Sequence, residues 1–379
     1  MKRSISRRQF LSLVATGALV AACSPAQLPA TAPAQNKAAE PAPPTAAPAP
    51  TATPAPTNTP APAVSEAAAP ATAPVVTGRP EVIKFYPDIP SQVVQTHHAG
   101  VWQGDQLSPE ALRQMLDASI TKLTGLNDAK EAWAALFKPT EKVAIKVNTF
   151  SNSIIWTHVL LTKAVVASLQ DAGLPPEQIF IYDSLSMYSD AGYEVNKDGP
   201  GVRCIEESKF SGKFKVADHT TNLSDTLQSC DALINMPVLK SHMISGLTFA
   251  MKNHYGTANN PGGLHYPIDQ CIAELNALPP IKDKTRLIIG DVLEANLQYS
   301  NGWPYWKPDW KGDSILMSFD PVAHDTVGMQ ILEKLQTEND VALADSLKDK
   351  ATSYLQMAAD LNLGTNQADQ MDMAEINLS

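Results

Sequence analysis

The sequence predicts an α/β fold across residues 80–379, with a mostly parallel sheet flanked by helices in Rossmann-like layers. Short apolar segments recur along this part of the chain without clean alternation of apolar and polar residues. That pattern is typical of strands buried on both faces. Stretches with helical periodicity separate these segments. Alternating strand and helix patterns indicate parallel strands joined by helical crossovers.

The elements follow from the pattern in chain order. Strands are expected at residues 142–148, 178–183, 214–219, 232–236, 286–291 and 315–320. Helices are expected at residues 157–172, 244–254, 268–278, 321–335 and 341–361. Gly173 is expected to end the first of these helices, and Gly256 the second. Pro237 closes the fourth strand, so Lys240 and His242 are expected on a loop that follows it.

Polar residues gather at the ends of the predicted strands. In sheets of this kind, ligands bind beyond the carboxyl ends of the strands. Five residues fall at or just past such ends, and together they predict a shared cleft: Lys146, Asn148, Asp183, Asp291 and Asp320.

The segment from Asn235 to Gly256 is unusually basic for this acidic chain, because it carries Lys240, His242, Lys252 and His254. With Lys146, it supplies three ammonium groups that could converge. Ammonium groups in a dry cleft bind carboxylate or phosphate well. A desolvated lysine beside other cations has a lowered pKa and can act as a base or nucleophile.

These arguments predict a site for a small anionic ligand. Lys240, His242 and Asp183 are the expected catalytic residues, with His242 moving a proton near neutral pH. The expected substrate-binding residues are Lys146, Asn148, Lys252 and Asn253. The structural alternative is that Lys252 only neutralises the end of its helix and that the histidines make structural hydrogen bonds.

A divalent cation is a second possibility at the strand ends. Asp320 precedes Pro321 and is a natural N-cap, and Asp325 lies one turn into the same helix. With Asp291, these carboxylates could hold a metal or pair with the lysines. The domain's cysteines contain no CxxC pair, so an iron–sulfur cluster is not expected. All three are instead expected to be small buried side chains: Cys204, Cys230 and Cys271.

Residues 1–23 have the layout of an export signal. The pair Arg7 and Arg8 precedes a short apolar run, as in signals for the twin-arginine export machinery, which carries folded cargo. Small residues then lead to Cys23, the expected site of lipidation. Residues 24–79 are dominated by Ala, Pro and Thr and are expected to be a disordered stalk. The chain is therefore expected on the outer face of the cytoplasmic membrane, held by lipid alone.

The charge of the chain limits its partners. Removing the four basic residues of the signal from the formal charge of −10 leaves −14. A surface this acidic argues against nucleic acid as a partner. Residues 302–310 are rich in aromatic side chains, which could form a lid, stack on a planar ligand or pack on their own domain.

The segment INMPVLKSHMISGLTFAMKNHYG at residues 234–256 resembles the signature of the domain-of-unknown-function 362 family. The resemblance extends to KVN at 146–148, to Asp183, to Gly290-Asp291 and to SFDPVAHD at 318–325, and covers most of residues 140–335. It implies no established reaction. Some members of the family carry ferredoxin-like cysteine clusters, and this chain departs from them.

Three functions are compatible with these observations. The first is an extracytoplasmic enzyme that acts on a small anion with lysines, a histidine and an aspartate. The second is a tethered solute-binding protein that uses the same lysines only to hold its ligand. The third is a protein that holds a metal or cofactor loaded before export, which a twin-arginine signal favours.

Overall fold

The computed structural model of the chain describes residues 78–184, 186–300 and 302–379. The expectations for the export signal, for Cys23 and for the stalk fall in residues 1–77, outside the described residues. Within the described part, no helix is both long enough and apolar enough to cross a membrane.

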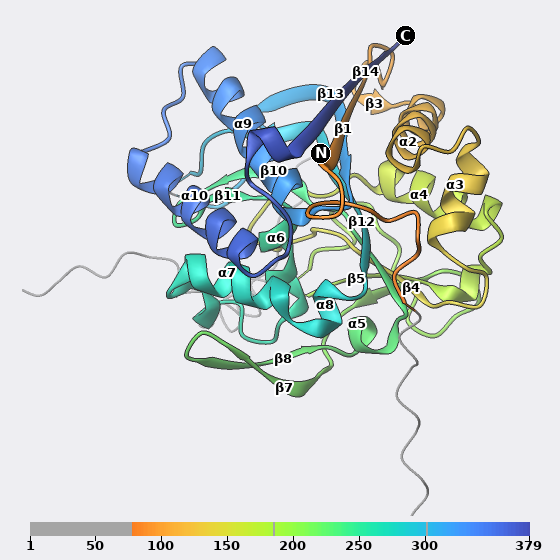
Figure 1. Ribbon diagram of the computed structural model, residues 1–379, viewed down its shortest axis with the longest axis horizontal. Coiled ribbons are helices and arrows are strands. Elements are labelled where there is room, and N and C mark those ends of the chain that lie inside the picture. The colour runs from red at the N-terminus through yellow and green to blue at the C-terminus, as the bar shows by residue number, and fades with distance from the viewer. Residues whose placement is uncertain (1–77, 185, 301) are drawn as a thin grey trace, which may run out of the picture. The chain divides into compact units, whose positions relative to one another are not determined.

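A mixed ten-stranded sheet forms the centre of residues 78–379 (Figure 1). Its main path runs in the order β14 (Met371–Leu378), β1 (Ser91–His98), β13 (Trp310–Ser318), β12 (Thr285–Asn296), β9 (Ala232–Asn235), β4 (Val143–Lys146), β5 (Ile179–Asp183) and β6 (Arg203–Glu206). From β12 to β6 each strand is parallel to its neighbour, whereas β13 is antiparallel to both of its own. The predicted mostly parallel α/β fold is confirmed.

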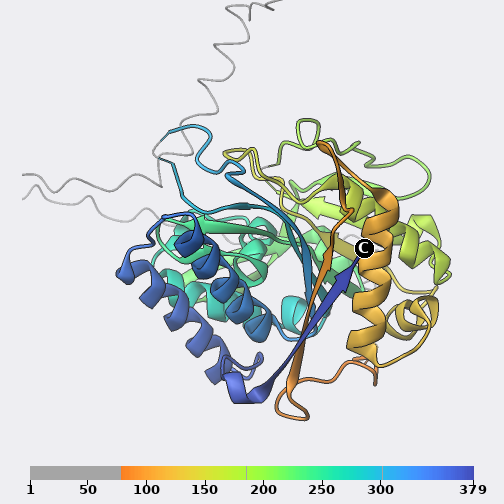
Figure 2. The same cartoon turned by 90° about the horizontal axis from the view of Figure 1, so that it is seen from above.

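Helices cover both faces of the sheet (Figure 2). One face carries α2 (Pro109–Thr124), α3 (Ala129–Leu136) and α4 (Val159–Asp171). The other carries α6 (Ala250–Asn253), α7 (Ile268–Ala277), α8 (Pro279–Lys282), α9 (Pro321–Glu338) and α10 (Asp345–Asp360). Shorter elements complete the domain: β2 (Trp102–Gln103), β3 (Gln106–Leu107), η3 (Pro176–Gln178), α5 (Asp225–Ser229), η5 (Gly263–His265) and η6 (Ala368–Gln370).

Each face of the sheet packs on its own apolar core. Adjacent strand residues point to opposite faces, so Val94 belongs to the core under α2 and Val93 to the core under α9. Full burial of a large apolar side chain stabilises the fold by about 1.5–3 kcal/mol. The predicted burial of the domain's cysteines is confirmed, and all three thiols are free: Cys204, Cys230 and Cys271.

The chain between Pro237 and Gly256 differs from the prediction. Residues 238–242, expected as a loop, form strand β10 (Val238–His242), and β11 (Gly246–Thr248) pairs antiparallel with it. The expected helix at 244–254 is reduced to the four residues of α6, and Gly256 lies within the 3-10 helix η4 (His254–Thr257). The cause is the length of β12, which extends beyond β9 and offers its free half to β10.

The strand expected at residues 214–219 is also wrong. These residues span the turn of a hairpin between β7 (Phe210–Val216) and β8 (His219–Ser224), which pair with each other outside the main sheet. The turn uses Ala217, at a φ of 50°, in place of the glycine or proline that would have indicated it.

Candidate functional site

The parallel strands β4, β5 and β9 end side by side. Lys146, the last residue of β4, is paired in register with Asn235, the last residue of β9. On the other side Lys146 is paired with Tyr182, so Asp183 lies one residue further along β5. Strand β10 and the α6–η4 turn close over these ends. The structure therefore brings the predicted catalytic and substrate-binding residues into one buried group, called the lysine cluster below: Lys146, Asn148, Asp183, Lys240, His242, Lys252 and Asn253.

Lys146 is held as an ammonium group. Its Nζ atom lies 2.7 Å from Oδ1 of Asp183 and donates to the carbonyl of Val147 at 2.6 Å and to Oδ1 of Asn253 at 3.3 Å. Three acceptors, one of them a carboxylate, match the three N–H bonds of an ammonium. Burial lowers the pKa of Lys146, and the Asp183 carboxylate works against that shift.

Asp183 is fully engaged in this pair. Its Oδ2 accepts from the backbone and hydroxyl of Thr149 at 2.7 and 3.2 Å. Its Oδ1 accepts from the backbone N–H of Ser184 at 2.8 Å in addition to Lys146. These four donors occupy both oxygens of the carboxylate. Asp183 therefore holds the Lys146 side chain in place, and its catalytic role stays a prediction.

Gly256 allows η4 to approach this ion pair. A Cβ atom at Gly256 would lie 2.2 Å from Oδ1 of Asp183 and 2.8 Å from Nζ of Lys146. Only a glycine backbone fits against the pair at this distance. Gly256 was expected to end a helix. Its role in the structure is instead to leave room for the ion pair, because a larger residue would not fit.

Lys240 has a different environment. Its side chain is 2 % exposed, and its Nζ donates to Oδ1 of Asn148 at 2.7 Å and to the carbonyl of Ile155 at 3.2 Å. Both acceptors are neutral, and two N–H bonds are the number that a neutral amine has. Among the described residues, the ammonium form would find no acceptor for its third N–H bond, which is costly in this buried place.

The pKa of Lys240 agrees with this geometry. Burial lowers it to about 7, with the charges of Lys252 and Lys146 acting in the same direction and outweighing Asp183. A substantial fraction of the Lys240 side chains is therefore neutral near pH 7, and a neutral amine can act as a base or nucleophile.

A chain of amides fixes the orientation of Asn148. Its Nδ2 donates to Oδ1 of Asn253 at 3.1 Å, so its own oxygen is turned to Lys240. Asn253 in turn donates to Oδ1 of Asn235 at 2.8 Å, and Asn235 donates to the carbonyl of Ala250 at 2.8 Å. Asn235 was not expected in the site. Its place at the end of β9 was the available signal.

His242 is held as a neutral ring. Its Nδ1 accepts from the backbone N–H groups of Ile244 and Ser245 at 3.1 and 3.2 Å, which places the proton on Nε2. The ring stacks between His265 and Trp306, with centroids 5.6 Å from each. Burial and the nearby cations lower its pKa well below 6.5. The ring therefore offers its Nε2–H as a hydrogen-bond donor, and proton transfer by His242 stays a prediction.

Lys252 points into the cluster. Its Nζ lies 3.4 Å from Nε2 of His265 and 4.3 Å from the centroid of the Tyr255 ring. His265 donates from Nδ1 to the carbonyl of Pro261 at 2.8 Å, so its Nε2 accepts from Lys252. Lys252 also lies in the last turn of α6, so the alternative role of neutralising a helix end stays open beside its contacts in the cluster.

Two buried hydroxyls beside the cluster have no hydrogen-bond partner among the described residues. These are Oγ of Ser184, which follows Asp183, and Oγ1 of Thr248, which is paired in register with Lys240 across β10 and β11. A buried polar atom without a partner costs about 1–3 kcal/mol. Such atoms are typical of places that a ligand completes.

Trp306 covers the cluster. Its Nε1 donates to the carbonyl of Ser241 at 2.8 Å, and its ring centroid lies 6.0 Å from Nζ of Lys240. Its carbonyl accepts from the backbone of Ile154 at 2.9 Å. It belongs to a small apolar cluster separate from the two cores. Within the aromatic segment singled out in the sequence, Trp306 therefore packs on its own domain beside Lys240, whereas Trp303 is exposed.

The three carboxylates expected to hold a metal have separate partners. Oδ2 of Asp291 accepts from the backbone and ring of His158, both at 2.8 Å. Asp320 caps α9, as predicted, and burial raises its pKa to about 6. Asp325 caps α6 by accepting from the backbone of Ala250 and Met251. In the part of the chain that the structure describes, no three His, Cys, Asp or Glu side chains gather as a metal site.

Comparisons with known proteins place the chain in a family. The lactate racemase apoprotein from Thermoanaerobacterium thermosaccharolyticum has a similar structure, with 9 % identity and a TM-score of 0.36 over 63 % of this chain. The match covers 56 % of that racemase chain, and at this identity it concerns the fold alone. No curated protein matches. Residues 143–330, which carry the whole lysine cluster, match the family model described as Domain of unknown function (DUF362), and the chain belongs to that family.

Proposed function

We propose that this protein is an enzyme that binds a small anion, a carboxylate or a phosphate, in the lysine cluster and uses the neutral amine of Lys240 as a base. The observation that carries the proposal is the contrast between Lys146 and Lys240. Lys146 is paired with a carboxylate, whereas Lys240 donates only to the neutral oxygens of Asn148 and Ile155.

The surroundings of Lys240 suit an anionic substrate. Lys146 and Lys252 lie close enough to lower the pKa of Lys240 electrostatically. The Nε2–H of His242 and the hydroxyls of Ser184 and Thr248 are further donors. Donors preorganised in a water-free site stabilise negative charge that develops in a reaction far better than water does.

The proposed step is the removal of a proton from carbon next to the bound acid group. The Lys240 amine takes the proton and becomes an ammonium, and the electron pair of the C–H bond moves into the substrate's acid or carbonyl group. The neighbouring cations and the His242 donor stabilise the resulting enolate. A positioned base contributes about 10²–10⁴-fold to such a step.

Deuterium exchange tests the step without knowledge of the natural substrate. The full-length chain is incubated in D₂O with pyruvate, malonate or phosphoglycolate, and loss of the substrate C–H signals is followed by proton NMR. Wild-type protein is expected to accelerate the exchange. Lys240→Met is expected to abolish it while part of the anion affinity is kept. The matched control is Lys213→Met, an exposed lysine on β7.

The alternatives predict other results. A tethered solute-binding protein would bind one of these anions without exchange, and Lys240→Met would reduce affinity alone. A protein that holds a cofactor would show an added mass in native mass spectrometry with elemental analysis. Absence of both binding and exchange for carboxylates and phosphates alike would overturn the enzymatic proposal.

The cellular place is part of the proposal. Residues 6–11 have the twin-arginine pattern, and small residues precede Cys23. On this basis the enzyme acts on the outer face of the cytoplasmic membrane, with lipid on Cys23 as its anchor and the Ala/Pro/Thr-rich segment as a spacer.

A further inference from the structure

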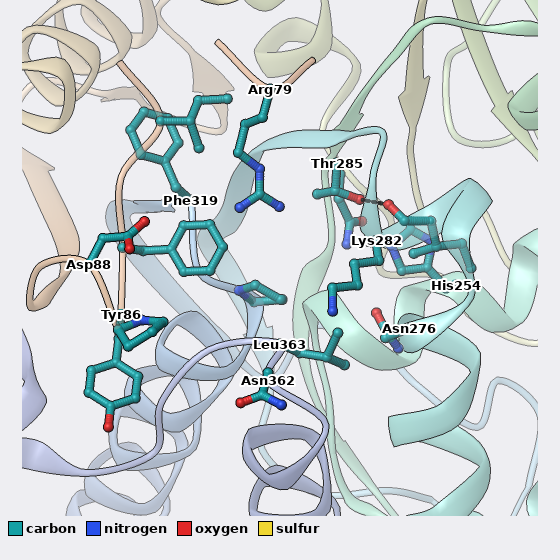
Figure 3. Close-up of a pocket in the computed structure, with 16 residues that line it drawn as sticks. Arg79, Tyr86, Asp88, His254, Asn276, Lys282, Thr285, Phe319, Asn362 and Leu363 are labelled. Atoms are coloured by element: carbon teal, nitrogen blue, oxygen red, sulfur yellow. Dashed lines mark hydrogen bonds between the residues drawn. The ribbon is translucent and has the colours of Figure 1, made fainter. Parts of the chain in front are cut away.

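A second candidate site is a pocket of about 190 Å³ on the face of the sheet that carries α7 to α10 (Figure 3). Its floor includes Asn235, which accepts a hydrogen bond from Asn253 of the lysine cluster. The segment before β1 forms one wall, α8 another, and the start of α9 and the loop after α10 complete it. Since a water molecule occupies about 30 Å³ in the liquid, this volume corresponds to about six waters and suits a ligand of few heavy atoms.

Two cationic side chains reach into this pocket. Figure 3 shows the guanidinium of Arg79 and the ammonium of Lys282 directed toward its centre from different walls. Neither group has an ion pair or a side-chain hydrogen bond within the described residues. The guanidinium lies 4.6 Å from the centroid of the Phe85 ring, which fixes its position. The charges of Asp283, Asp88 and Asp320 act on Arg79 from longer range, but among the described residues none of them forms an ion pair with it.

The rest of the lining is largely apolar. Ile281 and Leu363 are buried, and the ring of Phe319 faces the same space (Figure 3). The polar floor is already satisfied, because Asn235 donates to Ala250 and lies 3.2 Å from Nε2 of His254. The pocket therefore combines two cationic side chains with apolar surface.

We infer that this pocket binds a small organic carboxylate, with the carboxylate group against Arg79 and Lys282 and the apolar body against Phe319 and Leu363. The planar fork of an arginine matches the two oxygens of a carboxylate. Phosphate without an organic part would contact the cations alone and gain nothing from the apolar wall.

Asp88 also lines the pocket, and its charge acts on Arg79. It is exposed, and it competes with an incoming carboxylate for the guanidinium. Its removal should therefore strengthen the binding of an anion. If the pocket instead held a cation, removal of Asp88 would weaken binding, so this residue distinguishes the two signs of ligand charge.

Isothermal titration of the full-length chain with benzoate, butyrate and inorganic phosphate tests the inference. Benzoate and butyrate are expected to bind more tightly than phosphate. The double variant Arg79→Gln with Lys282→Gln is expected to lose about tenfold or more in affinity, because it removes both charged donors. Asp88→Asn is expected to increase affinity. Lys84→Gln, an exposed residue of the same segment, is the matched control and should change nothing.

Lys240→Met should leave this binding unchanged, so failure here is separable from failure of the proposed enzymatic step. Arg79→Lys, which keeps the charge and loses the fork, should retain part of the affinity and shows that losses do not come from misfolding. The inference is overturned if the double variant binds like wild type, if Asp88→Asn weakens binding, or if millimolar benzoate and butyrate do not bind.

Discussion

The Nζ atom of Lys240 donates to Oδ1 of Asn148 at 2.7 Å, and no carboxylate accepts from it in the described part of the chain. The amide of Asn148 is itself held by Asn253, so it cannot turn its nitrogen toward the lysine without breaking a second hydrogen bond. This arrangement stabilises the neutral amine. Each of the first two predictions below depends on it.

Lys146 and Lys240 should differ in what they contribute to stability. Lys146→Met breaks a buried ion pair and leaves the Asp183 charge unpaired, which typically costs about 3–5 kcal/mol. Lys240→Met leaves two neutral acceptors unpaired but removes an amine that is costly to bury, so a smaller loss is expected. Urea unfolding of both variants measures the difference. Equal losses would mean that Lys240 is held as an ion pair.

Stability should rise with pH because of Lys240. The folded chain releases this proton at about pH 7, whereas the unfolded chain keeps it up to the ordinary lysine pKa of 10.5. Between these values the unfolded state binds more protons, so the free energy of unfolding increases by up to about 1.4 kcal/mol per pH unit. Below about pH 7 both states bind the proton, so the full free-energy cost of burying the charged Lys240 lowers the stability of the fold. Unfolding of wild type and Lys240→Met from about pH 6 to about pH 9 should diverge accordingly, and parallel curves would contradict the lowered pKa.

Gly256→Ala should be strongly destabilising. The added methyl group would lie 2.2 Å from the Asp183 carboxylate, so the buried pair or the η4 turn must shift. Overpacking of this kind costs about 1–3 kcal/mol. Gly302→Ala is the control, because its Cβ meets nothing within 4 Å. Thermal unfolding measures both, and a Gly256→Ala variant as stable as the control would argue against the tight approach of η4.

His242 variants should separate its two nitrogen atoms. His242→Asn keeps an acceptor near the position of Nδ1 for the backbone N–H groups of Ile244 and Ser245, so only a small loss of stability is expected. His242→Leu leaves both groups unpaired, which costs about 1–3 kcal/mol for each. Urea unfolding gives the comparison. Both variants should lose the proton exchange proposed for Lys240, since neither supplies the Nε2–H donor.

Export and anchoring can be tested through residues 7–23. Cys23→Ser should move the protein from the membrane to the soluble extracytoplasmic fraction, because no acyl chain can then be attached. Replacement of Arg7 and Arg8 by lysine should retain it in the cytoplasm. Cell fractionation with immunoblotting measures both. Membrane attachment of Cys23→Ser would contradict the lipid anchor.

Much of the sheet and the cluster was predictable, since buried strands and the polar residues at their ends have local patterns. Lys146 and Asp183 meet because parallel strands end at one edge. Helix α4, expected at 157–172, is observed at Val159–Asp171.

The remainder depends on contacts between distant segments. Strand β10 forms because β12 extends past β9 and pairs with it. Pro237, just before β10, indicated the end of a strand and so gave no sign of this pairing. Strands β1 and β14 were not predicted. They pair with each other although most of the domain's sequence lies between them. Asp325 accepts a hydrogen bond at the start of α6, and its position in the sequence gives no sign of this distant contact. Thr248 lies beside the site because it is paired in register with Lys240, and the local sequence pattern does not indicate this pairing.

The length of β12 has a consequence for how the protein matures. Lys240 meets Asn148 across 92 positions of sequence, and Lys146 meets Asn253 across 107. Contacts of such separation form slowly and late, because loop closure must come first. No partly folded fragment that lacks β12 can therefore place β10 and its lysine. A chain passed across a membrane unfolded would have to repeat this slow assembly outside the cell, whereas a chain exported after folding arrives with its lysines already in place.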